Sequence, residues 1–256
     1  TFFAWICMVP LFLYVRGKDN KHVLMVSFFT GLLGNYLTYN WIGAFGAGVP
    51  GGALVILIFL IPFMSVFFAL RFFLAELLSK KFENLRIFIY PSVWILIDYI
   101  HSLGYLAFPW PYLGYSQFEF IPFIQLASIT GILGITFIII LGNYLLSNVL
   151  HNWFESAKEK FSIQGILKTK QSKKYLIFLG VVLLIIIIGL ISVPETKSNI
   201  PKGKRLKVSL VQTCISPWKS WSRYKFNYLR TLIYHTEKTI AHNPDFIIWS
   251  ESATLE

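Results

Sequence analysis

Six apolar segments dominate the pattern of hydrophobic and polar positions along the chain. They cover residues 1–15, 23–42, 53–78, 88–106, 121–150 and 175–193. Because about 20 apolar residues cross a ~30 Å hydrocarbon core as a helix, most of these segments are long enough to span a bilayer. Four of them contain long stretches without Asp, Glu, Lys or Arg, which would leave a water-soluble helix without a polar face. The pattern predicts a polytopic α-helical membrane bundle over residues 1–193.

The segment at 88–106 carries the weakest membrane signal. It contains Pro91, Asp98 and His101, so a buried helix of a soluble protein is its main rival. Ionisable groups inside a span are costly and usually face the bundle interior. We expect Asp98 and His101, three residues apart, to bond to one another or to the loop that contains Phe108. For Arg71 and Glu76, near the end of the preceding segment, we expect a local ion pair or side chains that reach the membrane surface.

A different pattern begins after residue 193. Residues 194–204 are rich in Pro, Gly, Lys and Ser and predict a linker, and residues 205–256 predict the beginning of an α/β domain. Leu206, Val208, Leu210 and Val211 indicate a first strand, and residues 246–249 a second, fully buried one. Between them, residues 222–242 can form a helix, with an apolar side made of Phe226, Leu229, Ile233 and Ile240. A strand, helix and strand usually form a right-handed crossover between parallel strands, with sites at their carboxyl ends.

Composition and charge support a membrane protein and give it an orientation. Of 256 residues, 55% are hydrophobic and 14% charged, and the mean hydropathy is +0.62. The net charge of +11 lies in short blocks between apolar runs, which argues against a nucleic-acid-binding face. The basic loops at 16–22, 79–87 and 151–174 alternate with uncharged ones, so the positive-inside tendency places them in the cytoplasm. Everything after Val193 then lies on the opposite side.

Glu251 is the strongest candidate for chemistry on position alone. It follows the second predicted strand, where a partly desolvated carboxylate can act as a general base, although a surface glutamate that caps the next element fits as well. The two cysteines, Cys7 and Cys214, form no disulfide framework or metal motif. Cys7 is read as a small apolar side chain, and Cys214 has no base or cation that would favour its thiolate. The sequence predicts no metal site and no cofactor.

The residues around Glu251 also resemble a known family. Asp245 to Ala253 is similar to the first signature of the nitrilase superfamily, and specifically to that of the apolipoprotein N-acyltransferases. Val211-Gln212 followed by Trp221, and Phe108-Pro109-Trp110 in a loop between membrane segments, are similar to further stretches of the same family. The resemblance implies that the outer part belongs to a nitrilase-like α-β-β-α sandwich. It also implies substrate-binding roles for Trp221, Phe108 and Trp110.

The same resemblance implies an activity. A Glu–Lys–Cys triad would take an acyl chain from a phospholipid as a thioester and pass it to the N-terminal diacylglyceryl-cysteine of a lipoprotein, with Glu251 as general base. The protein would be a multi-pass protein of the bacterial inner membrane with its catalytic domain on the periplasmic side. The Lys and Cys would lie beyond Glu256. We therefore expect a piece of a longer protein, inactive by itself.

Two other functions fit the sequence without this resemblance to the acyltransferases. A membrane-tethered amidase of the nitrilase type would use the same glutamate and water as the acceptor. A transporter or scaffold would use the intramembrane polar groups to bind cargo, with the outer domain as an accessory. A lysine and a cysteine at strand ends in the sequence after Glu256 would separate the enzymes from the transporter.

Overall fold

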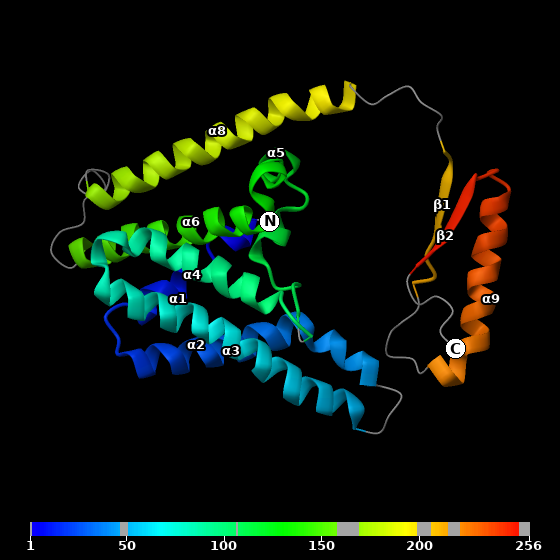
Figure 1. The fold of residues 1–256 in the computed structure, drawn as a ribbon, viewed down its shortest axis with the longest axis horizontal. Helices are drawn as coiled ribbons and strands as arrows, with labels where there is room; N and C mark the ends of the chain where they lie inside the picture. The colour runs from blue at the N-terminus through cyan, green and yellow to red at the C-terminus, as the bar shows by residue number, and fades with distance from the viewer. Residues whose placement is uncertain are drawn as a thin grey trace. The chain divides into compact units, whose positions relative to one another are not determined.

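The computed structural model describes residues 2–46, 51–105, 107–157, 169–198, 206–214 and 221–250. Within these residues the chain is mostly helical, with a short parallel two-stranded sheet in the C-terminal part (Figure 1). Contacts group the chain into two compact units, one of residues 1–33 and 64–199 and the other of residues 34–63 and 200–256.

The helices follow the apolar segments closely. In chain order they are α1 (Val9–Val15), α2 (Asn20–Tyr39), α3 (Gly52–Lys81), α4 (Arg86–His101), α5 (Ile121–Ile124), α6 (Ala127–Ala157), α8 (Lys170–Ser198) and α9 (Trp221–Ile240). Short 3₁₀ segments lie at Phe2–Trp5, Asn40–Gly46, Glu83–Leu85 and Leu113–Gln117, and the strands are β1 (Val208–Val211) and β2 (Phe246–Trp249).

Among the described residues, three helices are long and apolar enough to cross a membrane. They are Gly52–Lys81, Ala127–Glu155 within α6 and Lys170–Ser192 within α8, which agrees with the predicted segments at 53–78, 121–150 and 175–193. The remaining three predicted segments coincide with shorter or more polar helices, namely α2, α4 and the apolar stretch Phe2–Val15. Membrane crossing by these three stays a prediction.

The predicted segment at 121–150 is not one continuous helix. It begins as the short helix α5, which ends at Ile124, and the chain becomes helical again at Ala127. Gly131 then interrupts α6 with a φ of 66°, a left-handed conformation that glycine adopts without steric cost. The apolar run alone could not locate this break, because hydrophobicity says nothing about local backbone geometry.

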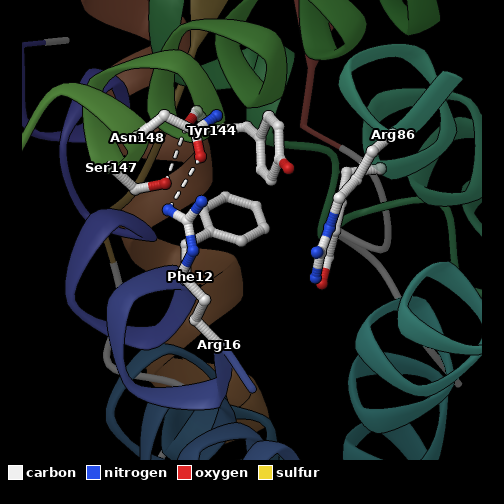
Figure 2. Close-up of a pocket in the computed structure, with 7 residues that line it drawn as sticks. Phe12, Arg16, Arg86, Tyr144, Ser147 and Asn148 are labelled. Atoms are coloured by element: carbon white, nitrogen blue, oxygen red, sulfur yellow. Dashed lines mark hydrogen bonds between the residues drawn. The ribbon is translucent and has the colours of Figure 1, made fainter. Parts of the chain in front are cut away.

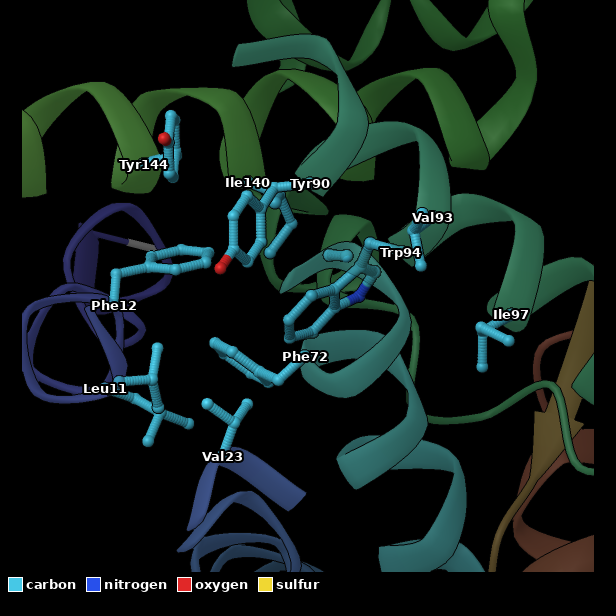
Figure 3. Packing of buried hydrophobic residues seen from close by; sticks show 12 residues of the cluster. Leu11, Phe12, Val23, Phe72, Tyr90, Val93, Trp94, Ile97, Ile140 and Tyr144 are labelled. Atoms are coloured by element: carbon cyan, nitrogen blue, oxygen red, sulfur yellow. The ribbon is translucent and has the colours of Figure 1, made fainter. Parts of the chain in front are cut away.

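One buried cluster joins five helices of the first unit (Figure 3). Phe12 of α1 packs with ring centroids 5.2 Å from Phe72 of α3 and 5.1 Å from Tyr90 of α4. Tyr90 in turn stacks on Tyr144 of α6 at 4.9 Å. Val23, in the first turn of α2, also belongs to the cluster. Burial of these large side chains fixes how the helices pack around α1.

The C-terminal part forms the predicted strand, helix and strand. β1 and β2 pair in parallel, with Val208 opposite Phe246 and Val211 opposite Trp249, and α9 packs against the sheet (Figure 1). Two hydrogen bonds between Lys207 and Asp245 fix the start of the strand pair. The Lys207 N–H donates to Asp245 Oδ2 at 2.7 Å, and the Asp245 N–H donates to the Lys207 carbonyl oxygen at 2.7 Å. The parallel crossover predicted from sequence is confirmed.

Two details of this prediction were wrong. The face of α9 that packs is formed by Tyr228, Leu232 and Thr236, whereas Phe226 and Ile233 are 71% and 51% exposed. Strand β2 is also not fully buried, because all four of its side chains are between 37% and 56% exposed. Alternate residues point to opposite faces of a strand, and among the described residues of this part none covers the face opposite α9.

Candidate functional site

The loop that follows α4 carries two of the predicted substrate-binding residues, Phe108 and Trp110. Their ring centroids lie 4.9 Å apart, so the structure brings the two aromatic side chains together. Trp110 is 49% exposed and Phe108 is half-buried. Phe108 donates its backbone N–H to the carbonyl oxygen of His101 at 3.0 Å, which fixes the loop to the last turn of α4. The pair forms a small, partly exposed aromatic surface at this end of α4.

A layer of packed side chains lies beneath this loop. The imidazole of His101 stacks on Phe67 of α3, with ring centroids 4.0 Å apart, and lies 6.3 Å from the Phe108 ring. Tyr112, at the other end of the loop, donates its hydroxyl to the Asp98 carbonyl oxygen at 3.0 Å. The loop is therefore anchored to α4 on both sides of Trp110.

Arg71 and Asp98 form a buried ion pair between α3 and α4. Arg71 Nε donates to Asp98 Oδ1 at 3.0 Å, and Nη2 contacts the same oxygen. The side chains are 5% and 0% exposed. The Arg71 guanidinium also lies 5.2 Å from the Trp94 ring centroid, within the range of a cation–π interaction. The pair supports the end of α4 from which the aromatic loop begins.

The ion pair between Arg71 and Asp98 was not expected from the sequence. Arg71 and Glu76 do not bond to one another; Arg71 pairs with Asp98, and Glu76 pairs with Arg86 at 2.8 Å. The Asp98 carboxylate bonds to Arg71. The expected contact of Asp98 and His101 with the Phe108 loop is confirmed, but through their backbone carbonyl oxygens, which accept from the Tyr112 hydroxyl and the Phe108 N–H. The sequence separation of 27 residues gave no signal for this partner, because it depends on how two helices pack.

The residues after the aromatic loop are clamped against α6. Gly114 donates its backbone N–H to Thr136 Oγ1 at 3.0 Å, and a Cβ on Gly114 would lie 2.8 Å from the Ile132 carbonyl oxygen. The side chain of Gln117 is fully buried and accepts a hydrogen bond from Trp5 Nε1 at 3.1 Å. The 3₁₀ segment Leu113–Gln117 can approach α6 this closely only because Gly114 lacks a side chain.

A second candidate site, described by itself, lies at the carboxyl ends of β1 and β2. Val211 and Trp249 are paired in register, so the chain leaves both strands at the same edge of the sheet. Val211 is 3% exposed, and Trp249 donates Nε1–H to Thr236 Oγ1 of α9 at 3.1 Å. Gln212 therefore follows one strand beside the point where the other strand leads toward Glu251.

Two predicted site residues cannot be placed in this geometry. Glu251 lies outside the described residues, and so does the side chain of Trp221, although the backbone of Trp221 begins α9. Cys214, which the sequence argument rejects as a nucleophile, is exposed and has a φ of 50°. The catalytic role of Glu251 and the binding roles of Trp221, Phe108 and Trp110 remain predictions.

Comparison with known proteins decides the family. The family profile described as "Apolipoprotein N-acyltransferase N-terminal domain" matches residues 1–145, which is more than half of the chain. The chain belongs to the apolipoprotein N-acyltransferase family. The matched residues include the Phe108 loop and end before the stretch around Glu251.

Named acyltransferases of this family align with nearly the entire chain. "Apolipoprotein N-acyltransferase 1" of Treponema denticola is 26% identical over 99% of this chain, and "Apolipoprotein N-acyltransferase" of Geobacter metallireducens is 26% identical over 98%. "Apolipoprotein N-acyltransferase 2" of Treponema denticola is 30% identical over 72%. The chain spans about half the length of these curated relatives or less, between 34% and 46%.

Proposed function

We propose that the complete protein transfers an acyl chain from a phospholipid to the α-amino group of a lipoprotein's N-terminal diacylglyceryl-cysteine. One observation carries the proposal: a chain of the apolipoprotein N-acyltransferase family has a parallel β–α–β unit whose second strand leads directly into Glu251. Carboxyl ends of parallel strands are where α/β folds gather catalytic groups. Fold and family alone do not assign a residue's role, so the role of Glu251 needs its own test.

The proposed reaction has two acyl-transfer steps. Glu251 takes the proton of a cysteine thiol, the sulfur attacks an ester carbonyl of the phospholipid, and the lysophospholipid leaves with that proton on its alcohol oxygen. The amine of the lipoprotein then attacks the thioester and gives up a proton to Glu251, and the departing cysteine sulfur takes that proton from Glu251 to become the thiol again. Splitting the transfer through a covalent intermediate replaces one difficult step by two easier ones. The cysteine, and a lysine that stabilises the oxyanion, would follow Glu256 in the complete protein.

The aromatic loop would bind the acyl chains of the donor. Phe108 and Trp110 present adjoining rings, and Trp110 is 49% exposed. Aromatic rings at the membrane surface offer an apolar body beside a polar environment. In this proposal Trp221, at the start of α9, contacts substrate beside the glutamate.

The proposed location is the bacterial inner membrane, with residues 205–256 on the periplasmic side. The basic loops support this orientation, because cytoplasmic loops carry an excess of Lys and Arg. Residues 16–22 and 79–87 hold Arg16, Lys18, Lys21, Lys80, Lys81 and Arg86. Cysteine accessibility labelling in intact cells would test the assignment. If a cysteine placed at position 207 is labelled only after the inner membrane is permeabilised, the periplasmic assignment of residues 205–256 is refuted.

Replacement of Glu251 by Gln tests the mechanism directly. In the full-length protein, Glu251→Gln keeps the size of the side chain and removes the base, so the thioester formed from a radiolabelled phospholipid should fall by at least about a hundredfold. Glu237→Gln is the matched control, since Glu237 is exposed on α9 and should label normally. Unchanged thioester in Glu251→Gln would remove the residue from the mechanism. Release of free acid or ammonia from a small amide, with no transfer to a lipoprotein peptide, would favour the amidase.

A further inference from the structure

Several basic side chains gather at one end of the helical bundle. Arg16 follows the last residue of α1, Arg86 begins α4, and Lys80 lies in the last turn of α3. Lys80 Nζ donates to Asn20 Oδ1 at 2.6 Å and to the Lys18 carbonyl oxygen at 3.4 Å, which joins the end of α3 to the start of α2. Two of the basic loops, at residues 16–22 and 79–87, therefore meet at the same end of the bundle.

A pocket opens between these helix ends. It is lined by Phe12, Arg16, Arg86, Tyr90, Tyr144, Ser147 and Asn148 and encloses about 220 Å³ of empty space, its open mouth included. Figure 2 shows Arg16 beside Asn148 and Ser147 on one side of the space and Arg86 on the other. The pocket is narrow, because side chains from three helix ends approach one another around it. It therefore has room for one oxygen-sized atom, with the rest of a ligand at the mouth.

The charges around the pocket do not cancel. Arg86 is paired on one side, since its Nη2 donates to both carboxylate oxygens of Glu76 at 2.9 and 2.8 Å. Its Nε is buried and has no hydrogen-bond acceptor among the described residues. Arg16 makes only a neutral contact, from Nη1 to Asn148 Oδ1 at 3.0 Å. Two guanidinium groups thus face one carboxylate.

The surroundings of Arg16 make an anion favourable there. Burial lowers the pKa of the Arg16 guanidinium, although the group stays protonated at neutral pH. A charged group that is partly removed from water and paired only with an amide gains when an anion approaches. The planar fork of arginine suits the tetrahedral oxygens of phosphate, and a bundle end that carries basic loops lies at the depth of lipid phosphates.

We propose that the pocket between Arg16 and Arg86 binds a phosphate group, with one phosphate oxygen inserted between the two guanidinium groups and the remainder outside the mouth. The expected source is an anionic phospholipid of the leaflet that faces the basic loops. Free inorganic phosphate has the same chemistry and is the other possible source. This site is separate from the aromatic loop and from Glu251, and it does not depend on the proposed acyl transfer.

Lipid binding by the full-length protein in a neutral detergent tests the proposal. The probes are phosphatidylglycerol, a phosphate-free galactolipid and inorganic phosphate, and the readout is the apparent affinity for each from ligand-dependent thermal unfolding. Arg16→Gln removes one charge-assisted contact and should weaken phosphatidylglycerol binding about tenfold. Lys21→Gln is the matched control, because Lys21 is exposed in the same loop region and loses the same charge. Arg16→Lys keeps the charge without the fork and should fall between Arg16→Gln and the unaltered protein.

The outcomes separate the sources. Tight, Arg16-dependent binding of phosphatidylglycerol without an effect of millimolar phosphate supports a lipid headgroup. Arg16-dependent binding of both supports the phosphate site with a soluble source as well. Equal losses in Arg16→Gln and Lys21→Gln, or equal binding of the galactolipid, would overturn the proposal. If Arg16→Gln does not fold, Arg16→Lys against Lys21→Gln decides in the same way.

Discussion

The buried pair Arg71–Asp98 makes a quantitative prediction about the stability of the helical bundle. Asp98→Leu leaves the Arg71 guanidinium, which is 5% exposed, without its carboxylate. Removal of one partner of a buried ion pair typically costs about 3–5 kcal/mol, since the other charge stays buried and uncompensated. Arg71 keeps its contact with the Trp94 ring at 5.2 Å, which offsets about 1 kcal/mol. We therefore expect a cost of about 3 kcal/mol.

The double variant separates the ion pair from packing. Arg71→Met with Asp98→Leu replaces both charges by apolar side chains, an exchange that is often neutral or stabilising for a buried pair. The coupling energy in the double-mutant cycle should then be at least about 3 kcal/mol, the cost of Asp98→Leu, and larger by whatever Arg71→Met costs alone. Unfolding of the full-length protein in mixed micelles, followed by the loss of helical circular dichroism, measures all four proteins. Lys81→Met, at the exposed end of α3, controls for the loss of a positive charge.

The result that would refute this reasoning is additivity. If the two single substitutions cost the same in sum as the double variant, the charges do not stabilise one another and the pair is incidental to packing. A double variant far less stable than either single variant would show instead that the polar groups have other essential partners.

Two further predictions concern the aromatic loop. Gly114→Ala should destabilise the full-length protein by about 1–3 kcal/mol in thermal unfolding, because the new Cβ would lie 2.8 Å from the Ile132 carbonyl oxygen. The control Gly34→Ala should be close to neutral, since nothing lies within 4 Å of the added Cβ. Equal losses of stability in the two variants would contradict the close approach of Gly114 to α6. Trp110→Ala should lower kcat/KM for the phospholipid donor about thirtyfold, mainly through KM, since a partly exposed indole contributes about 2 kcal/mol of apolar contact. Phe118→Ala, which truncates a side chain 69% exposed outside this loop, is the control, and an equal loss there would leave Trp110 without a specific role.

The features that follow from local pattern could be predicted from the sequence. Long uncharged runs predicted the helices α3 and α8, and the order of elements predicted the parallel pairing of β1 and β2. The packed side of α9 could not be predicted, because this helix has two stripes of possible contact residues. The apolar Phe226 stripe is the more hydrophobic, yet the Tyr228 and Leu232 stripe packs on the sheet. Hydrophobicity shows which side of α9 is more apolar, whereas the connections to β1 and β2 determine which side packs on the sheet.

The candidate site shows the same division. The proximity of Phe108 and Trp110 follows from their spacing of two residues in a short loop. The support beneath them does not, since the pairing of Arg71 with Asp98 and of Glu76 with Arg86 requires the relative position of α3 and α4. Charged residues within membrane segments indicate that they have partners. Three-dimensional packing determines which oppositely charged residue is the partner.

The uncovered face of the two-stranded sheet has a practical consequence for experiments. Val208, Leu210, Phe246 and Ile248 share that face by their register and are between 45% and 75% exposed. A recombinant peptide limited to residues 206–250 would expose a contiguous hydrophobic patch to water, bordered by two unpaired strand edges. Such a surface is a template for self-association. Biochemical work on the outer domain should therefore start from the full-length polypeptide in detergent or lipid rather than from an excised β–α–β piece.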